Sequence, residues 1–177
     1  MAYAASVTTT TLDSPPVPGR WLARLGFGAA ALGAGALGVL TMFGEGRPDG
    51  AWFQALKKPW FQPPNYLFGP VWTVLYGMIA YSGYRVWNQP ASPARTRALQ
   101  LWGAQLVLNA MWTPLFFGAQ RPDLALVDIV ALDAAVLAYA ATAAKLDRPA
   151  AGLMVPYLGW IGFATALTSA IVLKNRE

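Results

Sequence analysis

The chain has 177 residues and a formal net charge of +5, and 56% of its residues are hydrophobic whereas only 12% are charged. A soluble domain carries about a quarter charged residues, so this chain has too few to cover a water-facing surface. It contains no cysteine and no histidine. Disulfides, thiolate nucleophiles, zinc–thiolate sites and a Ser-His-Asp triad are therefore excluded, and we expect no bound metal.

The N-terminal 19 residues are rich in Thr, Ser, Ala and Pro, and Asp13 is their only charged side chain. We expect residues 1–19 to be a disordered tail. Residues 20–177 are then one domain. Its lysines and arginines stand at the ends of apolar runs and form no basic stripe, so we expect no nucleic-acid partner.

Five apolar stretches dominate this domain. Four are free of charge over 20 or more residues, and the fifth, Leu124–Ala144, is interrupted only by Asp128 and Asp133. A helix of about 20 residues crosses a bilayer core. The fold class is therefore predicted to be all-α, an integral, multi-pass membrane bundle of five transmembrane helices. The expected spans are about 21–43, 65–87, 98–117, 124–145 and 150–173. Buried helices of a soluble protein, the alternative, would need a polar outer shell that this sequence lacks.

Five spans place the two termini on opposite sides of the membrane. Seven lysines and arginines then lie on the N-terminal side and six on the other. Because the lysines and arginines are divided almost equally, the positive-inside rule gives no preferred orientation.

The first span is built almost entirely from Ala, Gly and Leu. Ala31 and Gly35, like Ala34 and Gly38, stand four residues apart. Small residues at this spacing let two helices approach closely in lipid. These four residues are therefore predicted to form either a dimer interface or a contact with another helix of the same chain.

The connection that follows, residues 44–64, carries aromatic side chains among lysines and prolines. Aromatic residues at such a place suit a membrane-interface belt. However, the connection is long for a small bundle, and long loops are often lids over a site.

Polar side chains inside the third and fourth spans mark candidate sites. Gln105, Asn109 and Trp112 share one face of the third span and could hold the polar edge of a flat apolar ligand, or hydrogen-bond neighbouring helices. Asp128 and Asp133 lie about 140° apart around the fourth span, so they are not a same-face catalytic pair. We expect Asp133 to face protein or a water-filled cavity.

Several strings in this sequence are characteristic of one family. Two are continuous: KPWFQPP at residues 58–64 and FGPVWTVLY at 68–76. In the third span they are Gln105-Leu106, Leu108-Asn109, Trp112, Pro114 and Phe116-Phe117-Gly118. In the fifth span they are Val155-Pro156-Tyr157-Leu158, Trp160 and Phe163-Ala164-Thr165. In this order, over residues 21 to about 173, the chain resembles the TspO/MBR family of tryptophan-rich sensory proteins. Only the N-terminal tail falls outside the resemblance.

The resemblance implies a pocket under the connection between the first two spans. Such pockets bind porphyrins such as protoporphyrin IX, sterols and synthetic ligands. By position, the pocket would be lined by Phe53, Pro63, Pro64, Trp72, Tyr76, Gln105, Asn109, Trp112, Trp160 and Ala164. The family's sterol motif has a tyrosine in the fifth span where this chain has Ser169, so that role is not expected here.

Three functions are predicted, two of them with the help of the resemblance and the third from the small residues of the first span. The first is a membrane receptor or translocator-type protein that binds a tetrapyrrole or a similar flat lipophilic molecule, with no required cofactor. The second is a light- and oxygen-dependent porphyrin-degrading enzyme, in which Trp72 and Trp160 are the catalytic candidates. The third is a structural or regulatory subunit of a larger membrane complex. The resemblance also implies a homodimer.

Overall fold

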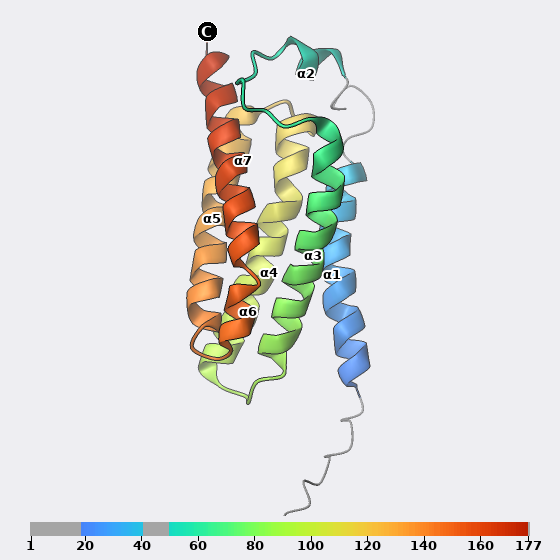
Figure 1. Ribbon diagram of the computed structural model, residues 1–177, viewed down its shortest axis with the longest axis vertical. Helices are drawn as coiled ribbons and strands as arrows, with labels where there is room; N and C mark the ends of the chain where they lie inside the picture. Colours follow the sequence, from blue (N-terminus) through green and yellow to red (C-terminus); the bar gives the residue numbers. More distant parts are fainter. Residues whose placement is uncertain (1–18, 41–49, 177) are drawn as a thin grey trace, which may run out of the picture.

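The computed structural model describes residues 19–40 and 50–176, with the side chains of Arg20 and Val39 left out. The predicted tail therefore lies outside the described residues except for Gly19. The described ranges are mainly helical and contain no strand, which confirms the all-α class. Five helices of 20 to 22 residues stand side by side (Figure 1): α1 (Arg20–Leu40), α3 (Phe68–Trp87), α4 (Pro93–Thr113), α5 (Pro122–Ala143) and α7 (Val155–Lys174).

The order of packing places α4 near the middle of the bundle. It packs most closely against α5, while α1 packs against α3 and α4, and α5 packs against α7. A large apolar core lies among these helices and includes Ile79, Leu132, Val136 and Ile161. A smaller cluster, around Phe53, Phe116, Phe117, Ala125, Leu167 and Ile171, lies at the end of the bundle crossed by the connection between α1 and α3.

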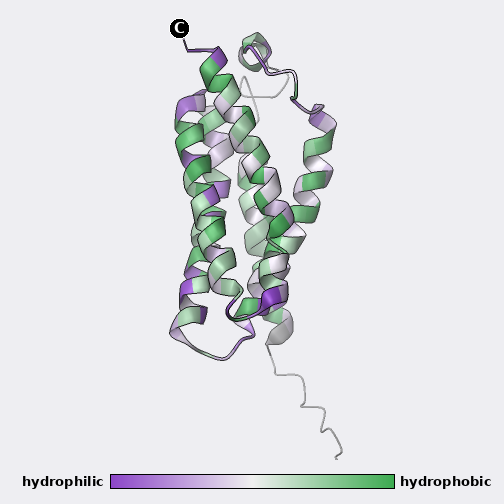
Figure 2. Cartoon of the chain, turned by 60° about the vertical axis from the view of Figure 1, so that its left-hand side comes forward, coloured by the Kyte–Doolittle hydropathy of each residue, from purple (hydrophilic) through white to green (hydrophobic). Residues whose placement is uncertain are grey.

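The outer surface of the bundle is also apolar. Large apolar side chains such as Leu32, Val127 and Leu137 are more than half exposed. Figure 2 shows hydrophobic residues along the length of the helices, with hydrophilic residues gathered mainly at the two ends. In the described part of the chain, two segments, Pro122–Ala143 and Arg148–Lys174, are long and apolar enough to cross a membrane. This surface suits lipid contact rather than water.

Two helix boundaries differ from the sequence prediction. The predicted third span starts at 98, but α4 begins at Pro93 because the Ser92 side chain accepts a hydrogen bond from the Arg95 backbone N–H and caps the helix. The helix then passes into a π-helical turn, η3 (Pro114–Gly118), where proline interrupts the regular hydrogen bonding.

The predicted fifth span, 150–173, is divided into two helices. A short helix, α6 (Arg148–Gly152), is followed by a turn at 153–154 and then by α7. Pro156 lies in the first turn of α7 and has no backbone N–H to continue a hydrogen bond to the preceding turn. Asp147 caps α6 by accepting a hydrogen bond from the Ala150 N–H.

Of the four small residues of α1, Ala31, Ala34 and Gly38 are buried within their own chain and Gly35 is half-buried. Ala31 is fully buried and Ala34 is 9% exposed. A Cβ atom added to Gly35 would lie 2.6 Å from the Tyr76 ring, and one added to Gly38 would lie 3.1 Å from the Thr113 hydroxyl. Of the two alternatives for these residues, the structure therefore shows the contact within the chain. Together they do not form an exposed dimer face.

Candidate functional site

Residues 50–67, the described part of the connection between α1 and α3, lie across the end of the bundle at which α7 terminates (Figure 1). They contain a short helix, α2 (Ala51–Ala55), and a 3-10 turn, η2 (Asn65–Leu67). Phe53 is buried, with its ring centroid 5.3 Å from that of Phe117. Phe61 contacts Phe163 of α7 with centroids 6.2 Å apart. These contacts make the described connection, residues 50–64, a cover over the bundle.

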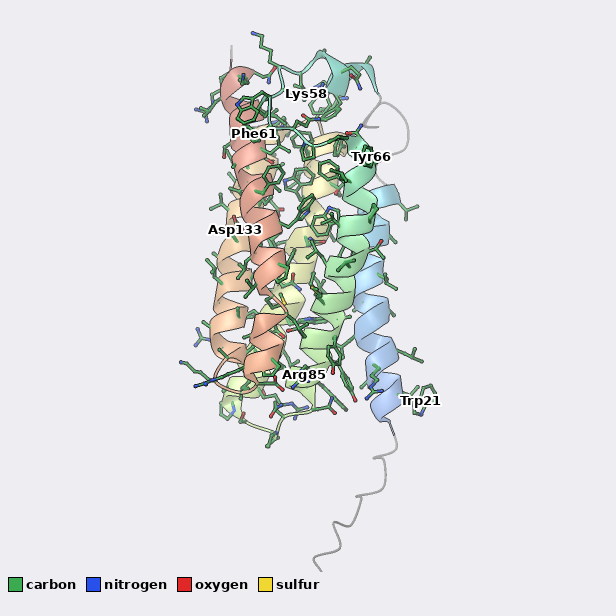
Figure 3. All side chains as sticks on the ribbon, in the orientation of Figure 1. Trp21, Lys58, Phe61, Tyr66, Arg85 and Asp133 are labelled. Carbon is green, nitrogen blue, oxygen red and sulfur yellow. The ribbon has the colours of Figure 1, made fainter. Side chains whose placement is uncertain are left out.

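A pair of hydrogen bonds fixes this cover to the end of α7. Asn175 accepts a hydrogen bond from the Lys57 N–H over 3.0 Å and donates one to the Lys57 carbonyl over 3.1 Å. Figure 3 shows the neighbouring Lys58 and Phe61 at this end of the molecule, far from Trp21 and Arg85 at the other. The Asn175 side chain therefore acts as a clasp between the cover and the C-terminal helix.

Beneath the cover, Asn109 of α4 joins three helices. Its side-chain oxygen accepts a hydrogen bond from the Tyr76 hydroxyl of α3 over 2.8 Å. Its side-chain nitrogen donates to the Tyr157 hydroxyl of α7 over 3.0 Å. Asn109 is 7% exposed and Tyr157 is fully buried. The amide therefore has the helix-joining role that was one of its two predicted alternatives.

Two polar atoms on the same face of α4 have no partner. The Gln105 side chain is fully buried and donates to the Trp102 carbonyl over 3.0 Å, but its Oε1 accepts no hydrogen bond. The buried indole N–H of Trp112 donates none. Buried polar groups without partners are uncommon in proteins, and each calls for an explanation. A ligand that offers both a donor and an acceptor would provide one.

Aromatic rings surround these amides. Trp72 stacks on Tyr76 with centroids 5.3 Å apart and meets the edge of Tyr157 at 6.1 Å. Trp112 stacks on Phe116 at 5.0 Å. Trp160 contacts Phe68 at 5.7 Å and Phe163 at 5.8 Å. Rings in offset or edge-to-face contact also present faces that suit a flat ligand.

The predicted pocket residues thus fall into two groups. The first group packs against the large core or is buried: Trp72, Tyr76, Trp112, Trp160 and Ala164 pack against it, and the amides Gln105 and Asn109 are buried. Phe53 belongs to the smaller cluster, while Pro63 is half-buried and Pro64 is exposed in the cover. Trp112 packs against both clusters and links them.

Sequence reasoning left Tyr157, Phe116 and Phe163 out of the pocket. Tyr157 could have been predicted as a pocket residue, because its spacing from Trp160 and Ala164 places the three on one side of a helix. Two hollows formed by described residues lie elsewhere, on the two sides of the N-terminal half of α1, and no predicted pocket residue lines either.

The two aspartates of α5 have different surroundings. The Thr165 hydroxyl of α7 donates a hydrogen bond to Asp133 over 2.7 Å, so Asp133 faces protein as predicted. Asp128 is half-buried, and its Oδ2 has no hydrogen-bond partner. No cluster of three or more acidic side chains suited to a metal ion occurs in the described ranges.

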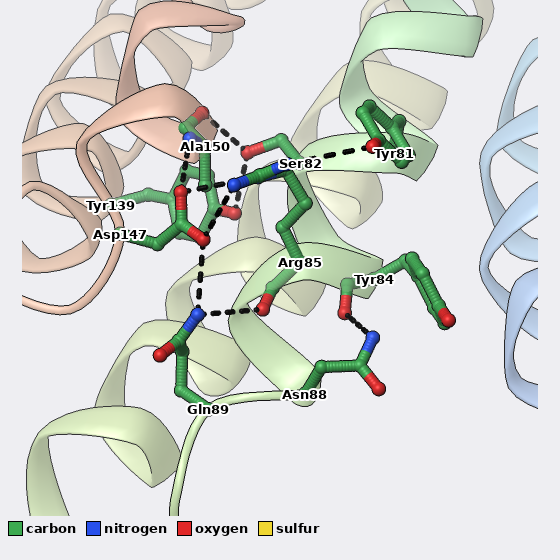
Figure 4. A network of polar contacts seen from close by, with 9 residues as sticks. All are labelled: Tyr81, Ser82, Tyr84, Arg85, Asn88, Gln89, Tyr139, Asp147 and Ala150. Atoms are coloured by element: carbon green, nitrogen blue, oxygen red, sulfur yellow. Dashed lines mark hydrogen bonds and ion pairs between the residues drawn. The ribbon is translucent and has the colours of Figure 1, made fainter. Parts of the chain in front are cut away.

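A second polar cluster closes the opposite end of the bundle (Figure 4). Arg85 of α3 donates two hydrogen bonds to Asp147, over 3.1 and 3.0 Å, and Gln89 donates a third over 3.0 Å. Ser82 bonds the Tyr139 hydroxyl and the Ala150 carbonyl. Burial alone would raise the pKa of Asp147, but hydrogen bonds from Arg85 and the Ala150 N–H lower it below its ordinary value. The cluster ties α3 to the turn between α5 and α7.

These features define an all-helical protein with a lipid-type outer surface, an enclosed aromatic and amide cluster, and a cover over one end of the bundle. The sequence profile of the TspO/MBR family matches residues 27–173. The chain belongs to the TspO/MBR family, whose members are membrane proteins.

Individual relatives cover most of the chain. The tryptophan-rich protein TspO of Archaeoglobus fulgidus is 42% identical over 148 residues, which span 83% of this chain and 95% of that protein. The translocator protein of Homo sapiens is 34% identical over 157 residues, 88% of this chain and 91% of the human protein. The tryptophan-rich sensory protein of Cereibacter sphaeroides is 36% identical over 147 residues, 83% and 87% of the two chains.

Proposed function

We propose that this protein is a membrane receptor or translocator-type protein that binds a tetrapyrrole, such as protoporphyrin IX, or a similar flat lipophilic molecule. The ligand lies beneath the cover, between α3, α4 and α7, and all five long helices cross the membrane. The human relative is named a translocator protein, and the Cereibacter sphaeroides relative is named a tryptophan-rich sensory protein.

The observation that carries the proposal is the pair of unpartnered polar atoms beside Asn109. Gln105 Oε1 lacks a hydrogen-bond donor and the Trp112 Nε1–H lacks an acceptor, and both atoms are buried. Leaving such atoms unpaired costs about 1–3 kcal/mol each. The carboxyl groups at the edge of protoporphyrin IX offer both kinds of partner when one is protonated. Binding would therefore pair atoms that the protein alone leaves unpaired.

The ring lining supports a flat apolar ligand. Trp72, Trp112 and Trp160 come from three helices, and each is already in ring contact. A macrocycle that separated these rings would replace ring–ring contacts by ring–ligand contacts of the same kind. Because these rings are already in contact beneath the cover, entry requires the cover to shift, and the Asn175 clasp is a polar attachment of the cover to α7.

Quenching of tryptophan fluorescence by protoporphyrin IX tests the proposal. The full chain in detergent should show saturable quenching. A variant with Trp72→Phe, Asn109→Leu and Trp160→Phe together should lose the saturable phase. Trp21→Phe is the matched control, because Trp21 is 62% exposed at the opposite end of the bundle. Equal saturable quenching in the triple variant and in Trp21→Phe would reject the site.

The stacked pair of Trp72 and Tyr76, with Tyr157 at the edge of Trp72, favours a second candidate, the light- and oxygen-dependent enzyme. Three oxidisable rings in contact form a short route for an electron. Illumination of bound protoporphyrin IX in oxygen would then give a defined product, and Trp72→Phe would abolish it. Bleaching at the same rate without protein excludes this candidate. The ring partners of Trp160 are Phe68 and Phe163, which lie outside this route.

Assembly into a homodimer or a larger membrane complex is a separate proposal. The face of α1 that remains open includes Gly33, where an added Cβ atom would meet nothing within 4 Å. Cross-linking in the native membrane would reveal an assembly through this face, and Gly33→Leu should weaken it. An unchanged cross-linked species would reject this interface.

A further inference from the structure

A hollow of about 400 Å³ lies between α1 and α3 at the end of the bundle away from the cover. Its lining residues are Arg24, Gly77, Ala80, Tyr81 and Tyr84. It shares none of them with the site beneath the cover. The hollow lies near the exposed Trp21 and the charged end of α3, where a membrane protein meets the lipid headgroups.

Arg24 gives this hollow an unbalanced positive charge. Its guanidinium lies 4.9 Å from the centroid of the Tyr84 ring. In the part of the chain that the structure describes, it makes no ion pair, whereas Arg85 pairs with Asp147 and Arg121 with Asp123. An arginine held over an aromatic ring keeps its N–H donors available to an anion.

The Tyr81 hydroxyl adds a second donor. It accepts a hydrogen bond from Arg85 Nη1 over 3.4 Å, which leaves its own O–H proton for another acceptor. Tyr81 is 50% exposed, and its ring stacks on Tyr84 with centroids 6.4 Å apart. Figure 4 shows Tyr81 on the same helix as Arg85, with that hydrogen bond drawn. Because Asp147 already neutralises Arg85, the excess charge of the site is that of Arg24.

The floor of the hollow is small and apolar. An added Cβ atom on Gly77 would meet nothing within 4 Å, so the helix surface is open there. Val74, one turn further from the charged end and on the same side of α3, is 57% exposed. The hollow thus continues from two hydrogen-bond donors at the interface onto an apolar helix surface that would lie in the membrane.

We propose that this hollow binds an anionic glycerophospholipid. Arg24 and the Tyr81 hydroxyl hold the phosphate group, and an acyl chain follows the open surface at Gly77 and Val74. Free phosphate would satisfy only the donors. A headgroup with its own cation, such as choline, would meet Arg24 with repulsion. The two hydrogen-bond donors and the apolar helix surface together therefore favour a lipid with a net negative charge.

Native mass spectrometry of the full chain in detergent tests this proposal. The probes are phosphatidylglycerol and phosphatidylcholine with the same acyl chains, and inorganic phosphate. Phosphatidylglycerol should bind with the lowest Kd. Arg24→Gln should raise that Kd about tenfold, because a charge-assisted contact is lost. Tyr81→Phe should raise it about threefold, because one neutral hydrogen bond is lost.

Arg97→Gln is the matched control, since Arg97 is an exposed arginine of α4 outside this hollow. It should leave the Kd within about twofold of the original value, as an exposed charge contributes little. An equal loss in Arg24→Gln and Arg97→Gln overturns the proposal, as does equal binding of the two lipids. Binding of inorganic phosphate with the same affinity also overturns it. If Arg24→Gln does not fold, an unchanged Kd in Tyr81→Phe overturns the assigned contact.

Discussion

The Tyr76 hydroxyl of α3 donates a hydrogen bond to Asn109 of α4 over 2.8 Å, deep under the cover. The side-chain nitrogen of Asn109 in turn donates a hydrogen bond to the Tyr157 hydroxyl of α7. One amide thereby fixes the three helices between which the ligand site is proposed. The same Tyr76 ring lies against Gly35 of α1, so the position of α1 and the geometry of the site are coupled.

Asn109→Ala should destabilise the folded protein by about 1–3 kcal/mol, because the half-buried Tyr76 hydroxyl and the buried Tyr157 hydroxyl both lose this partner. Tyr76→Phe removes only one of the two hydrogen bonds and should cost about 0.6 kcal/mol, the typical value between membrane helices. Unfolding in mixed detergent micelles measures both, and the double variant should be less destabilised than the sum. Strict additivity would mean that the two residues do not interact.

Gly35→Ala should destabilise by about 1–3 kcal/mol, because its new methyl group overlaps the Tyr76 ring. Gly33→Ala, in open space on the same helix, should stabilise by up to about 1 kcal/mol through helix propensity. The opposite signs distinguish the contact from any general effect of alanine. Thermal unfolding of both variants in detergent provides the comparison, and destabilisation of the same size in each would reject the Gly35–Tyr76 contact.

Asn175→Ala should loosen the cover, since it removes both hydrogen bonds to Lys57. Association and dissociation of protoporphyrin IX should both become faster, with a smaller change in the Kd, because a gate affects rates more than the bound state. Stopped-flow quenching measures the two rates. Lys174→Ala, at the neighbouring exposed position, is the control. Identical rates in the two variants would mean that the hydrogen bonds between Asn175 and Lys57 do not control ligand entry.

Asp147 should make stability fall at low pH. Because its folded-state pKa is lowered from the ordinary 3.8, its contribution is fully present above that pH and is lost as the pH falls through the lower folded pKa. Asp147→Asn should cost about 1–3 kcal/mol at neutral pH, through weaker hydrogen bonds to Arg85. It should also flatten this part of the pH profile. If the free energy of unfolding of Asp147→Asn falls as steeply at low pH as that of the original chain, other carboxylates cause the loss of stability.

Much of the fold follows from sequence, because long apolar runs are sufficient to place helices. The division between α6 and α7 was not predicted, since the run through Pro156 is continuously apolar and hydropathy does not record a missing N–H. The start of α4 at Pro93 was missed because its first turns are polar. The cap supplied by Ser92 outweighs that polarity.

The site was predictable in part. Spacing places Gln105, Asn109 and Trp112 on one face of a helix, but it does not tell which helix that face meets. The partners Tyr76 and Tyr157 come from distant segments, so the hydrogen bonds of Asn109 required the packed structure. For the same reason, the sequence left Gly35 between two alternatives that the neighbouring Tyr76 ring decides.

The location of bound tetrapyrrole is the most direct measurement. A protoporphyrin IX derivative with a light-activated cross-linker would be bound to the full chain, and the labelled peptides identified by mass spectrometry. Labels on Trp72, Trp112 or Trp160, displaced by excess protoporphyrin IX, are the expected result. Displaceable labels confined to Trp21 and Trp87, at the opposite end of the bundle, would contradict a site beneath the cover.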